Sequence, residues 1–349
     1  HKNEEVEQAV AKSFGVDVRV PARDMEELYK AIEKGVDDMI DLHKKNGKPV
    51  LIVCDGPHAR DYFRKKYPQF TDVVRFTEQT ALGDRPEQQQ DKSMRVVSYA
   101  RTDLKQKHEA KFIGQAVARA VNAVLTQLGT GYEEKPVLIL GYGAIGQATA
   151  EAFGGDRAKM YIFDPYLTPE QEADAKSKGY TVLKDKSQIS AGKFMTIGCS
   201  GHLSIDEEQI MASEPNAIYV SASSKLVEID MRKLREMATD EQGNVRKILA
   251  AEVNDQQTWH YWLKDGTIRT VIADGLPANF NDINSVPPEF IDMTMGLSLA
   301  AAVQALSKKD LGFSQLNDGD AKELNALYET MIERMHAEAK ALAAGEAPK

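Results

Sequence analysis

A glycine turn between two short apolar runs is the part of the chain best suited to chemistry. Gly141, Gly143 and Gly146 have the spacing G-x-G-x-x-G directly after the apolar run 137–140. The first glycine permits a tight turn, the second lets a pyrophosphate approach the backbone, and the third lets a helix pack closely on a strand. The run 160–163 then ends in Asp164, whose carboxylate can accept both ribose hydroxyls and would repel a 2′-phosphate. The pattern predicts an NAD site, and the alternative is an ordinary glycine-rich turn.

The residues around this turn complete the predicted cofactor site. A helix that starts near Ala144 would direct its free N–H groups and positive dipole end at the phosphates. Two later predicted strands, 194–197 and 217–220, end in small residues that let a dinucleotide lie against the backbone. The predicted contacts besides the glycines and Asp164 are Ala144, Ile145, Pro165, Gly198, Cys199, Ser200 and Ser223.

Polar residues also follow the predicted strands in the first third of the chain. Asp55 and His58 lie in the loop after the strand 50–53. Ligands bind at the carboxyl ends of strands in open α/β sheets, so Asp55 is placed for function. The alternatives are that Asp55 caps the helix 59–66 and that His58 is a surface residue of its first turn. Gln79 follows the predicted strand 73–76, and Arg101 follows the predicted strand 95–99.

The order of the remaining elements predicts the fold class. Hydrophobic spacing predicts further strands at 180–183 and 267–273, an irregular loop at 276–288, and helices at 23–45, 108–128, 169–178, 290–306 and 321–342. Alternating strands and helices predict an α/β fold with two doubly wound domains, one of them a Rossmann-type NAD-binding domain. We expect residues 1–107 and 290–349 to form a substrate-type domain, and residues 108–289 to form the NAD-binding domain.

Length and composition limit the number of domains and the kinds of partner that the protein can have. A chain of 349 residues is long enough for two domains. The net charge of −9 gives no support for a nucleic-acid partner. Two cysteines, Cys54 and Cys199, form neither a disulfide framework nor a metal site. We see no secretory signal and no apolar run of membrane-spanning length, so we expect a cytoplasmic protein without a membrane partner.

From about Asp24 to about Ala302 the chain resembles the S-adenosylhomocysteine hydrolase (adenosylhomocysteinase) family. The segments that carry the resemblance are 55–56, 66–69, 77–80 with Gly83, 141–143, 196–199, 227–230, 261–266 and 276–279. The resemblance implies a substrate domain, an NAD domain and a C-terminal segment that helps to build an oligomer, hence a dimer or tetramer. That family oxidises a ribose 3′-hydroxyl with tightly held NAD, eliminates homocysteine, adds water and reduces the ketone again.

The cofactor half of the family pattern matches this chain well. Asp164 lies where the family has its ribose-binding glutamate, and Asn279 matches the asparagine that binds the carboxamide. Thr80 matches the first of three threonines that contact NAD, but Ala81 and Leu82 replace the other two.

The catalytic half of the family pattern matches poorly. Asp55 matches the catalytic aspartate. Gln79 replaces a catalytic glutamate, and Arg101 is the nearest match to the lysine that activates the 3′-hydroxyl. Ser224 replaces a histidine, and Val286 lies near the place of a second one. Catalytic residues act as a unit, so these differences indicate that the original reaction has been lost.

Three hypotheses follow for the function. The first is an NAD-dependent, redox-active enzyme for a small or nucleoside-like substrate, with Asp55, Gln79, Arg101 and His108 around it. Arg101 would then hold a carboxylate, unless it is only a surface residue. The second is an NAD-binding protein without turnover that acts through protein partners, and the third is a genuine hydrolase. In the enzyme hypotheses Asp55, Gln79 and Arg101 lie near the nicotinamide across a cleft between the domains.

Overall fold

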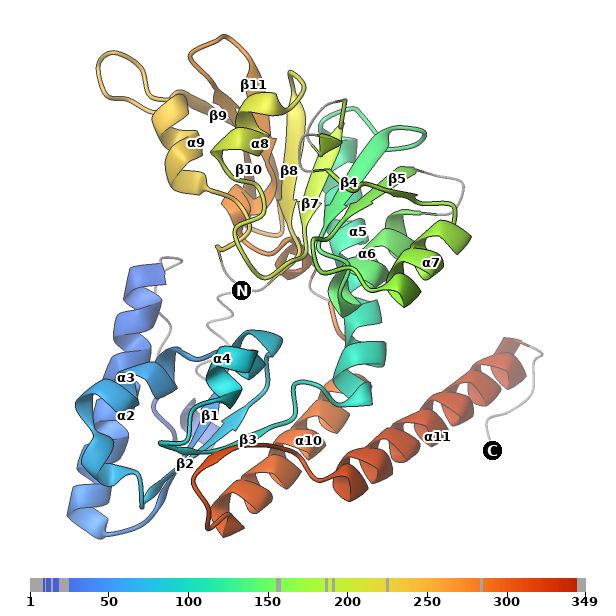
Figure 1. The fold of residues 1–349 in the computed structure, drawn as a ribbon. Helices are drawn as coiled ribbons and strands as arrows, with labels where there is room; N and C mark the ends of the chain where they lie inside the picture. Colours follow the sequence, from blue (N-terminus) through green and yellow to red (C-terminus); the bar gives the residue numbers. More distant parts are fainter. Residues whose placement is uncertain are drawn as a thin grey trace. The chain divides into compact units, whose positions relative to one another are not determined.

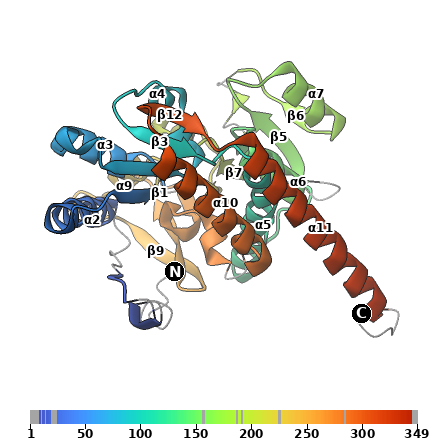
Figure 2. The ribbon, with the colours of Figure 1, turned by 90° about the horizontal axis from the view of Figure 1, so that it is seen from below.

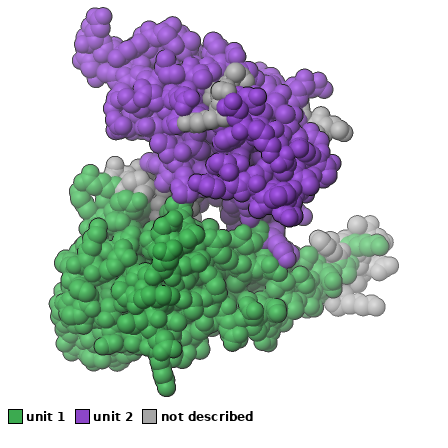
Figure 3. All heavy atoms as spheres, viewed as in Figure 1, with its two compact units in different colours: residues 1–106, 288–349 green, residues 107–287 purple. Residues whose placement is uncertain are grey.

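The chain forms two compact units (Figure 3), which comprise residues 1–106 with 288–349 (unit 1) and residues 107–287 (unit 2). The computed structural model describes residues 9, 11–13, 15–18, 25–154, 158–185, 188–189, 192–223, 226–282 and 285–343. Each unit contains its own sheet and its own buried hydrophobic cluster.

Unit 1 is built on a four-stranded parallel sheet (Figure 1) with the order β1-β2-β3-β12. The strands are β1 (Val50–Cys54), β2 (Val74–Glu78), β3 (Arg95–Ser98) and β12 (Gly312–Gln315). The helices are α2 (Met25–Asn46), α3 (His58–Lys66), α4 (Pro86–Gln89), α10 (Pro288–Ser307) and α11 (Asp318–Ala343), with short 3-10 turns η1 (Pro68–Phe70) and η2 (Ala81–Asp84). Val36 and Ile40 of α2 are buried with Phe63 and Phe76, which explains the helical spacing of apolar residues in α2.

Unit 2 is built on an eight-stranded sheet with the order β6-β5-β4-β7-β8-β11-β10-β9. The strands are β4 (Pro136–Leu140), β5 (Lys159–Phe163), β6 (Thr181–Val182), β7 (Met195–Gly198), β8 (Ala217–Ser221), β9 (Lys247–Val253), β10 (Gln256–Trp262) and β11 (Ile268–Val271). The six strands from β6 to β11 in this order are parallel, and β10 and β9 continue the sheet as an antiparallel hairpin. The strand order reverses between β4 and β7, and such a reversal opens a crevice at the carboxyl ends of the strands.

The helices of unit 2 connect these strands. They are α5 (Ala110–Gln127), α6 (Ala144–Phe153), α7 (Pro169–Ser177), α8 (Glu207–Ala212) and α9 (Met231–Met237), with 3-10 turns η5 (Ile272–Gly275) and η6 (Ala278–Asn281). The α5–α6 contact is very close, since a Cβ atom on Gly114 would lie 2.4 Å from the carbonyl carbon of Ala148. The predicted α/β fold class, with a Rossmann-type unit, is confirmed.

Several element boundaries differ from the sequence predictions. The helix predicted from His108 is preceded by a π-helical turn, η3 (Leu104–Glu109), so that α5 begins at Ala110. The strands β9, β10 and β12 were not predicted. β12 has the sequence Gly-Phe-Ser-Gln, which has little apolar character, and its pairing with β3 joins residues far apart in the chain.

Helix α10 is the most apolar helix of unit 1 and corrects one expectation. By length and composition alone this helix, labelled in Figure 2, could cross a membrane, and 28% of its apolar window is buried. The expectation that no apolar run reaches this length is therefore wrong for α10. One face of α10 packs against β1, β2 and β3, and a single helix that meets these criteria is weak support for a membrane span.

Candidate functional site

The glycine turn after β4 has the geometry that its spacing predicts. Gly141 has a φ of +93°, and a Cβ atom there would lie 2.7 Å from the Cα of Ser200 in the loop after β7. A Cβ atom on Gly146 would lie 2.0 Å from the carbonyl oxygen of Gly141. A Cβ atom on Gly143, the N-cap of α6, would have no neighbour within 4 Å among the described residues. Gly141 and Gly146 are thus required by packing, whereas Gly143 leaves open space at the start of α6.

Asp164 at the end of β5 is oriented toward this turn. Its Oδ2 accepts a hydrogen bond from the backbone N–H of Tyr142 at 2.7 Å, and its Oδ1 accepts one from the N–H of Tyr166 at 2.9 Å. A carboxylate has about four lone-pair sites, so both oxygens can still accept ribose hydroxyls. The adjacent Pro165 is exposed, and Ala144 and Ile145 form the first turn of α6.

Tyr142 anchors the turn and was not singled out in the sequence. Its ring is fully buried, and its hydroxyl donates to Asp174 of α7 at 3.1 Å. Burial, together with the Asp174 carboxylate, raises the pKa of Tyr142 well above its usual value. The side-chain amides of Gln147 and Gln171 each donate to the Tyr142 carbonyl at 3.1 Å. The backbone of the turn is therefore fixed without a ligand.

Glu228 is the second residue that organises the site, and in the sequence it stood out only as part of a family segment. This buried carboxylate accepts hydrogen bonds from Ser200 Oγ at 2.9 Å, Gly201 N at 2.5 Å and Ser223 Oγ at 2.6 Å, and also from Ser204 Oγ. These donors belong to the loops after β7 and β8, so Glu228 holds the two loops together.

The small residues after β7 are explained by the same carboxylate. A Cβ atom on Gly198 would lie 2.6 Å from Oε2 of Glu228, so only glycine fits there without a shift. Burial, with the nearby Glu228, raises the pKa of the Cys199 thiol far above its usual value. Cys199 is therefore a neutral packing residue and not a nucleophile. Ser224 lies outside the described residues.

Asn279 lies in η6, after a backbone segment in the left-handed region. Ala273 and Asp274 have φ values of 56° and 50°. Asp274 holds this segment, since it accepts hydrogen bonds from the Tyr261 hydroxyl at 2.5 Å and from Arg235 Nη2 at 3.2 Å. Asn279 is 8% exposed, and its amide donates to Ser285 Oγ at 3.4 Å.

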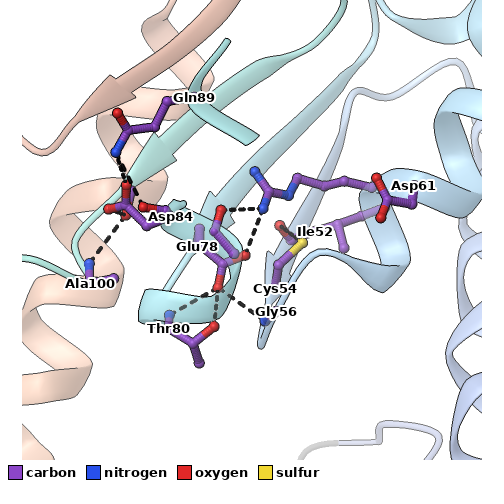
Figure 4. A network of polar contacts seen from close by, with 12 residues as sticks. Ile52, Cys54, Gly56, Asp61, Glu78, Thr80, Asp84, Gln89 and Ala100 are labelled. Carbon is purple, nitrogen blue, oxygen red and sulfur yellow. Dashed lines mark hydrogen bonds and ion pairs between the residues drawn. The ribbon is translucent and has the colours of Figure 1, made fainter. Parts of the chain in front are cut away.

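In unit 1 a buried glutamate, Glu78, organises the strand ends (Figure 4). Its Oε2 accepts from Arg60 Nη2 at 3.0 Å, and its Oε1 accepts from Gly56 N at 3.0 Å, Thr80 N at 2.9 Å and Thr80 Oγ1 at 2.8 Å. Burial raises the pKa of Glu78, while Arg60 and the backbone donors oppose that shift. The sequence pointed to Gln79 and Thr80, and the acid that positions both loops was missed.

The three predicted catalytic residues follow neighbouring strand ends. Cys54 pairs with Glu78, and Glu78 pairs with Ser98, so Asp55, Gln79 and Arg101 come after the same edge of the sheet. Asp55 is exposed, and the N-cap of α3 is Pro57. The helix α3 itself begins after Pro57, and the choice between a cap and a catalytic role for Asp55 stays a prediction.

Gln79 and Arg101 are both engaged by neighbouring groups. The Tyr99 hydroxyl lies 3.5 Å from Gln79 Oε1, within the limit for a weak hydrogen bond. Arg101 Nη2 donates to the Asp84 carbonyl at 2.8 Å, and Arg101 Nε lies 3.6 Å from Asp84 Oδ1. Asp84 is fully buried and also accepts from Ser98 Oγ at 2.6 Å. The Arg101 guanidinium is thus bound to Asp84, close to the end of β3.

His58 and His108 differ in their surroundings. The His58 ring stacks on Tyr29 with a centroid distance of 4.0 Å, and its Nε2 lies 3.1 Å from Glu33 Oε1. His108 lies in the π-helical turn before α5 and is partly buried. Catalytic roles for Asp55, Gln79 and Arg101 near a nicotinamide stay predictions, as do the contacts of Thr80 and Asn279 with a cofactor.

A cavity of about 410 Å³ in unit 2 lies elsewhere. It is lined by Met211 of α8, by Lys233, Glu236 and Met237 of α9, and by the turn 263–265. Because β11 starts after this turn and runs parallel to β8, the cavity lies at the edge of the sheet opposite to the glycine turn. It is therefore separate from the candidate cofactor site.

Comparison with known proteins shows distant relatives. No protein-family model matches the chain. The chain is 22% identical to the adenosylhomocysteinase of Saccharolobus solfataricus over 280 residues, which cover 78% of this chain and 62% of that protein. It is 26% identical to the adenosylhomocysteinase of Aeropyrum pernix over 190 residues, which cover 54% of this chain and 42% of that protein. The chain thus matches less than two thirds of the length of either relative, and the relationship is distant.

Two solved structures align with part of this chain at low TM-scores. One accompanies the identification of the pyruvate reductase of Chlamydomonas reinhardtii, with a TM-score of 0.40, 16% identity, and coverage of 60% of this chain and 64% of that chain. The other is a dipicolinate synthase chain from Bacillus halodurans, with a TM-score of 0.32, 13% identity, and coverage of 47% of this chain and 56% of that chain.

Proposed function

We propose that this chain is an NAD-binding protein, similar to adenosylhomocysteinases, that carries out oxidoreductase chemistry on a small or nucleoside-like substrate. The observation that carries the proposal is the turn after β4. Gly143 leaves open space at the start of α6, and Asp164 accepts a hydrogen bond from the same turn, where it would also accept ribose hydroxyls. The distant similarity to adenosylhomocysteinases supports the same cofactor.

The residues of unit 2 fit a dinucleotide by their chemistry. The first N–H groups of α6 would bind the pyrophosphate, and Asp164 would accept the ribose hydroxyls. The loops fixed by Glu228, with Gly198, Ser200 and Ser223, would bound the nicotinamide half. When bound, NAD supplies a hydride acceptor. Asn279, held beside Ser285, would donate to the carboxamide.

The edge of unit 1 would bind the substrate. Asp55 is an exposed carboxylate that can accept a proton, while Gln79 and Arg101 can hold polar groups of a small molecule. We propose that hydrolysis of S-adenosylhomocysteine is not its efficient reaction. A second candidate is an NAD-binding protein without turnover that acts through protein partners, which is favoured by the engagement of Arg101 with Asp84. The two cysteines, Cys54 and Cys199, are buried and suit a reducing, cytoplasmic location.

A matched pair of glycine variants tests the cofactor site. Gly143→Ala adds a methyl group where the pyrophosphate would approach, and Gly35→Ala adds the same group at an open position on α2. Calorimetry should show binding of NAD by the wild type and by Gly35→Ala, with at least about tenfold weaker binding by Gly143→Ala, or about 1.4 kcal/mol. Failure of the wild type to bind NAD would refute the proposal. Reduction of bound NAD by a metabolite would separate the enzyme from the protein without turnover.

A further inference from the structure

The cavity between α8 and α9 in unit 2 has an apolar wall and a charged rim. Its wall consists of Met211 near the end of α8, Met237 at the end of α9 and Leu263 in the turn after β10. Figure 1 shows α8 and α9 beside each other, and the two helices are in contact. Met211 is 60% exposed, so this apolar wall is open to solvent. The volume of about 410 Å³ is within the range of pockets that hold small molecules.

Two of the four charged side chains on the rim neutralise each other. Lys233 Nζ lies 3.4 Å from Glu236 Oε2 and 3.3 Å from Glu207 Oε2. Glu236 Oε1 also accepts a hydrogen bond from Arg232 Nη1 at 2.7 Å. These four side chains carry two positive and two negative charges, so together they offer no net charge to a ligand.

The other two charged side chains of the rim lie in the turn before β11. Asp265 Oδ1 accepts hydrogen bonds from the N–H and the hydroxyl of Thr267, at 2.8 and 2.6 Å. The backbone N–H of Lys264 donates to the Met237 carbonyl at 3.1 Å, which holds Lys264 at the end of α9. The Lys264 side chain is exposed, and within the part of the chain that the structure describes its ammonium has no hydrogen bond or ion pair. It is therefore the charge of the rim that is available to a ligand.

A buried arginine compensates the negative groups behind the cavity. Arg269 is 1% exposed, and its Nη2 donates to the carbonyl groups of Ile210 and Ser213, both at 3.1 Å. Carbonyl groups at the C-terminal end of a helix such as α8 carry partial negative charge, which would otherwise repel an anion. The Thr267 donors and the Arg269 charge also lower the pKa of Asp265 below its usual value. The surroundings of the cavity are thus compatible with an anionic ligand.

We infer that this cavity binds a small aromatic carboxylate, with its ring against Met211 and Met237 and its carboxylate at the Lys264 ammonium. Methionine side chains are flexible and polarisable, and their sulfur atoms make favourable contacts with aromatic rings. A single available ammonium suits a single negative charge, whereas a phosphate or a nucleotide would need several cationic donors. The cavity lies at the edge of the sheet opposite to the glycine turn, so this inference does not depend on NAD binding.

A matched pair of fluorescent probes tests the anionic part of the site. Anilinonaphthalene sulfonate has an aromatic body with one negative charge, and phenylnaphthylamine has the same body without the charge. Lys264→Ala should weaken binding of the sulfonate about threefold, as expected for an exposed ion pair, and should leave binding of phenylnaphthylamine unchanged. The control is Lys322→Ala, which removes an exposed lysine of α11 and should change neither affinity. If both variants weaken the sulfonate equally, or if neither does, the inference is overturned.

A second pair of variants tests the apolar wall. Met211→Asp should weaken both probes about tenfold, because a charged group replaces part of the apolar surface that the ring would cover. Met295→Asp on α10, where Met295 is 54% exposed, should leave both affinities unchanged. Met211 and Met295 are both exposed, so neither variant should prevent folding. Unchanged affinities for Met211→Asp would place the probes elsewhere and refute the site.

Methyl NMR locates the ligand directly in the complete chain. On addition of naphthoate, the methyl signals of Met211 and Met237 should shift, and that of Met295 should not. Replacement of each methionine by leucine in turn assigns the three signals. Naphthoate that shifts neither Met211 nor Met237 would overturn the inference, whether or not the protein binds NAD.

Discussion

At the scale of single residues, the Asp164 carboxylate already accepts two structural hydrogen bonds, and a ligand would have to bind to the same carboxylate. Its two oxygens hold the N–H groups of Tyr142 and Tyr166, which fixes the glycine turn relative to the end of β5. A ribose would therefore use the remaining lone pairs of a carboxylate that is already oriented. If NAD binds here as proposed, the charge of Asp164 would also repel a 2′-phosphate.

We expect Asp164→Asn to reduce selectivity between NAD and NADP. The amide keeps one acceptor oxygen but removes the charge that repels a 2′-phosphate, so binding of NAD should weaken about tenfold, or about 1.4 kcal/mol, and binding of NADP should weaken less. Calorimetry on both nucleotides measures this change. Asp174→Asn is the control, because Asp174 contacts the same turn through the Tyr142 hydroxyl only. Equal affinity of the wild type for NAD and NADP would contradict the prediction.

We expect Glu228→Gln to destabilise unit 2. This carboxylate accepts hydrogen bonds from Ser200, Gly201, Ser204 and Ser223, so an amide –NH₂ in its place would leave at least one buried donor unsatisfied. The free energy of unfolding should fall by about 1–3 kcal/mol, measured by urea denaturation. Glu333→Gln, at an exposed position on α11, is the control. The role of Glu228 in holding the two loops is wrong if both variants unfold at the same urea concentration.

The sequence predicts the candidate residues better than their partners. Spacing alone predicts the glycine turn and Asp164, because those positions follow from local backbone geometry. Spacing could not predict that Glu78 and Glu228 accept the hydrogen bonds that hold neighbouring loops together. Glu78 binds the N–H of Gly56, and Glu228 binds the hydroxyl of Ser200, so each contact joins loops that follow different strands. Such contacts depend on the register of the sheet.

At the scale of elements, the regular α/β repeats are predictable and the additions to the sheets are not. The strand–turn–helix unit β4–α6 and the strand β5 have strong apolar runs and clear stops, and they form as predicted. The hairpin of β9 and β10, which extends the sheet beyond β11, was not predicted. Their partners, like the partner of β12, are set by tertiary pairing.

The α5–α6 contact gives a prediction at this scale. We expect Gly114→Ala to destabilise unit 2 by about 1–3 kcal/mol, because the added methyl would overlap the backbone at Ala148. Gly35→Ala on α2 adds the same methyl to an open helical position and should stabilise unit 1 by up to about 1 kcal/mol. Thermal and urea denaturation measure both changes. If Gly114→Ala stabilises like Gly35→Ala, then α5 and α6 are not in close contact.

At the scale of the whole molecule, the chain crosses between its two units twice, at 106–107 and at 287–288. Unit 1 is therefore discontinuous in sequence. Its strand β12 pairs with β3, and all of unit 2 lies between these two strands in the sequence. The polar residues of both units follow the carboxyl ends of parallel strands, at Asp55, Gln79 and Arg101 in one unit and at the glycine turn in the other. Chemistry that uses both sets requires both units.

We expect this chain, with both units present, to hydrolyse S-adenosylhomocysteine slowly or not at all. The Gln79 amide cannot take up a proton as a glutamate can, and a guanidinium is a poor substitute for a lysine amine as a base. Arg101 also donates to the Asp84 carbonyl. The assay is homocysteine release measured with a thiol reagent, in parallel with absorbance of reduced NAD to detect redox chemistry without hydrolysis. The double variant Gln79→Glu/Arg101→Lys is the informative comparison, because a rise in its hydrolysis rate would place both residues at the reacting centre. Wild-type turnover of about 1 s⁻¹ or faster would show that the family residues were matched wrongly.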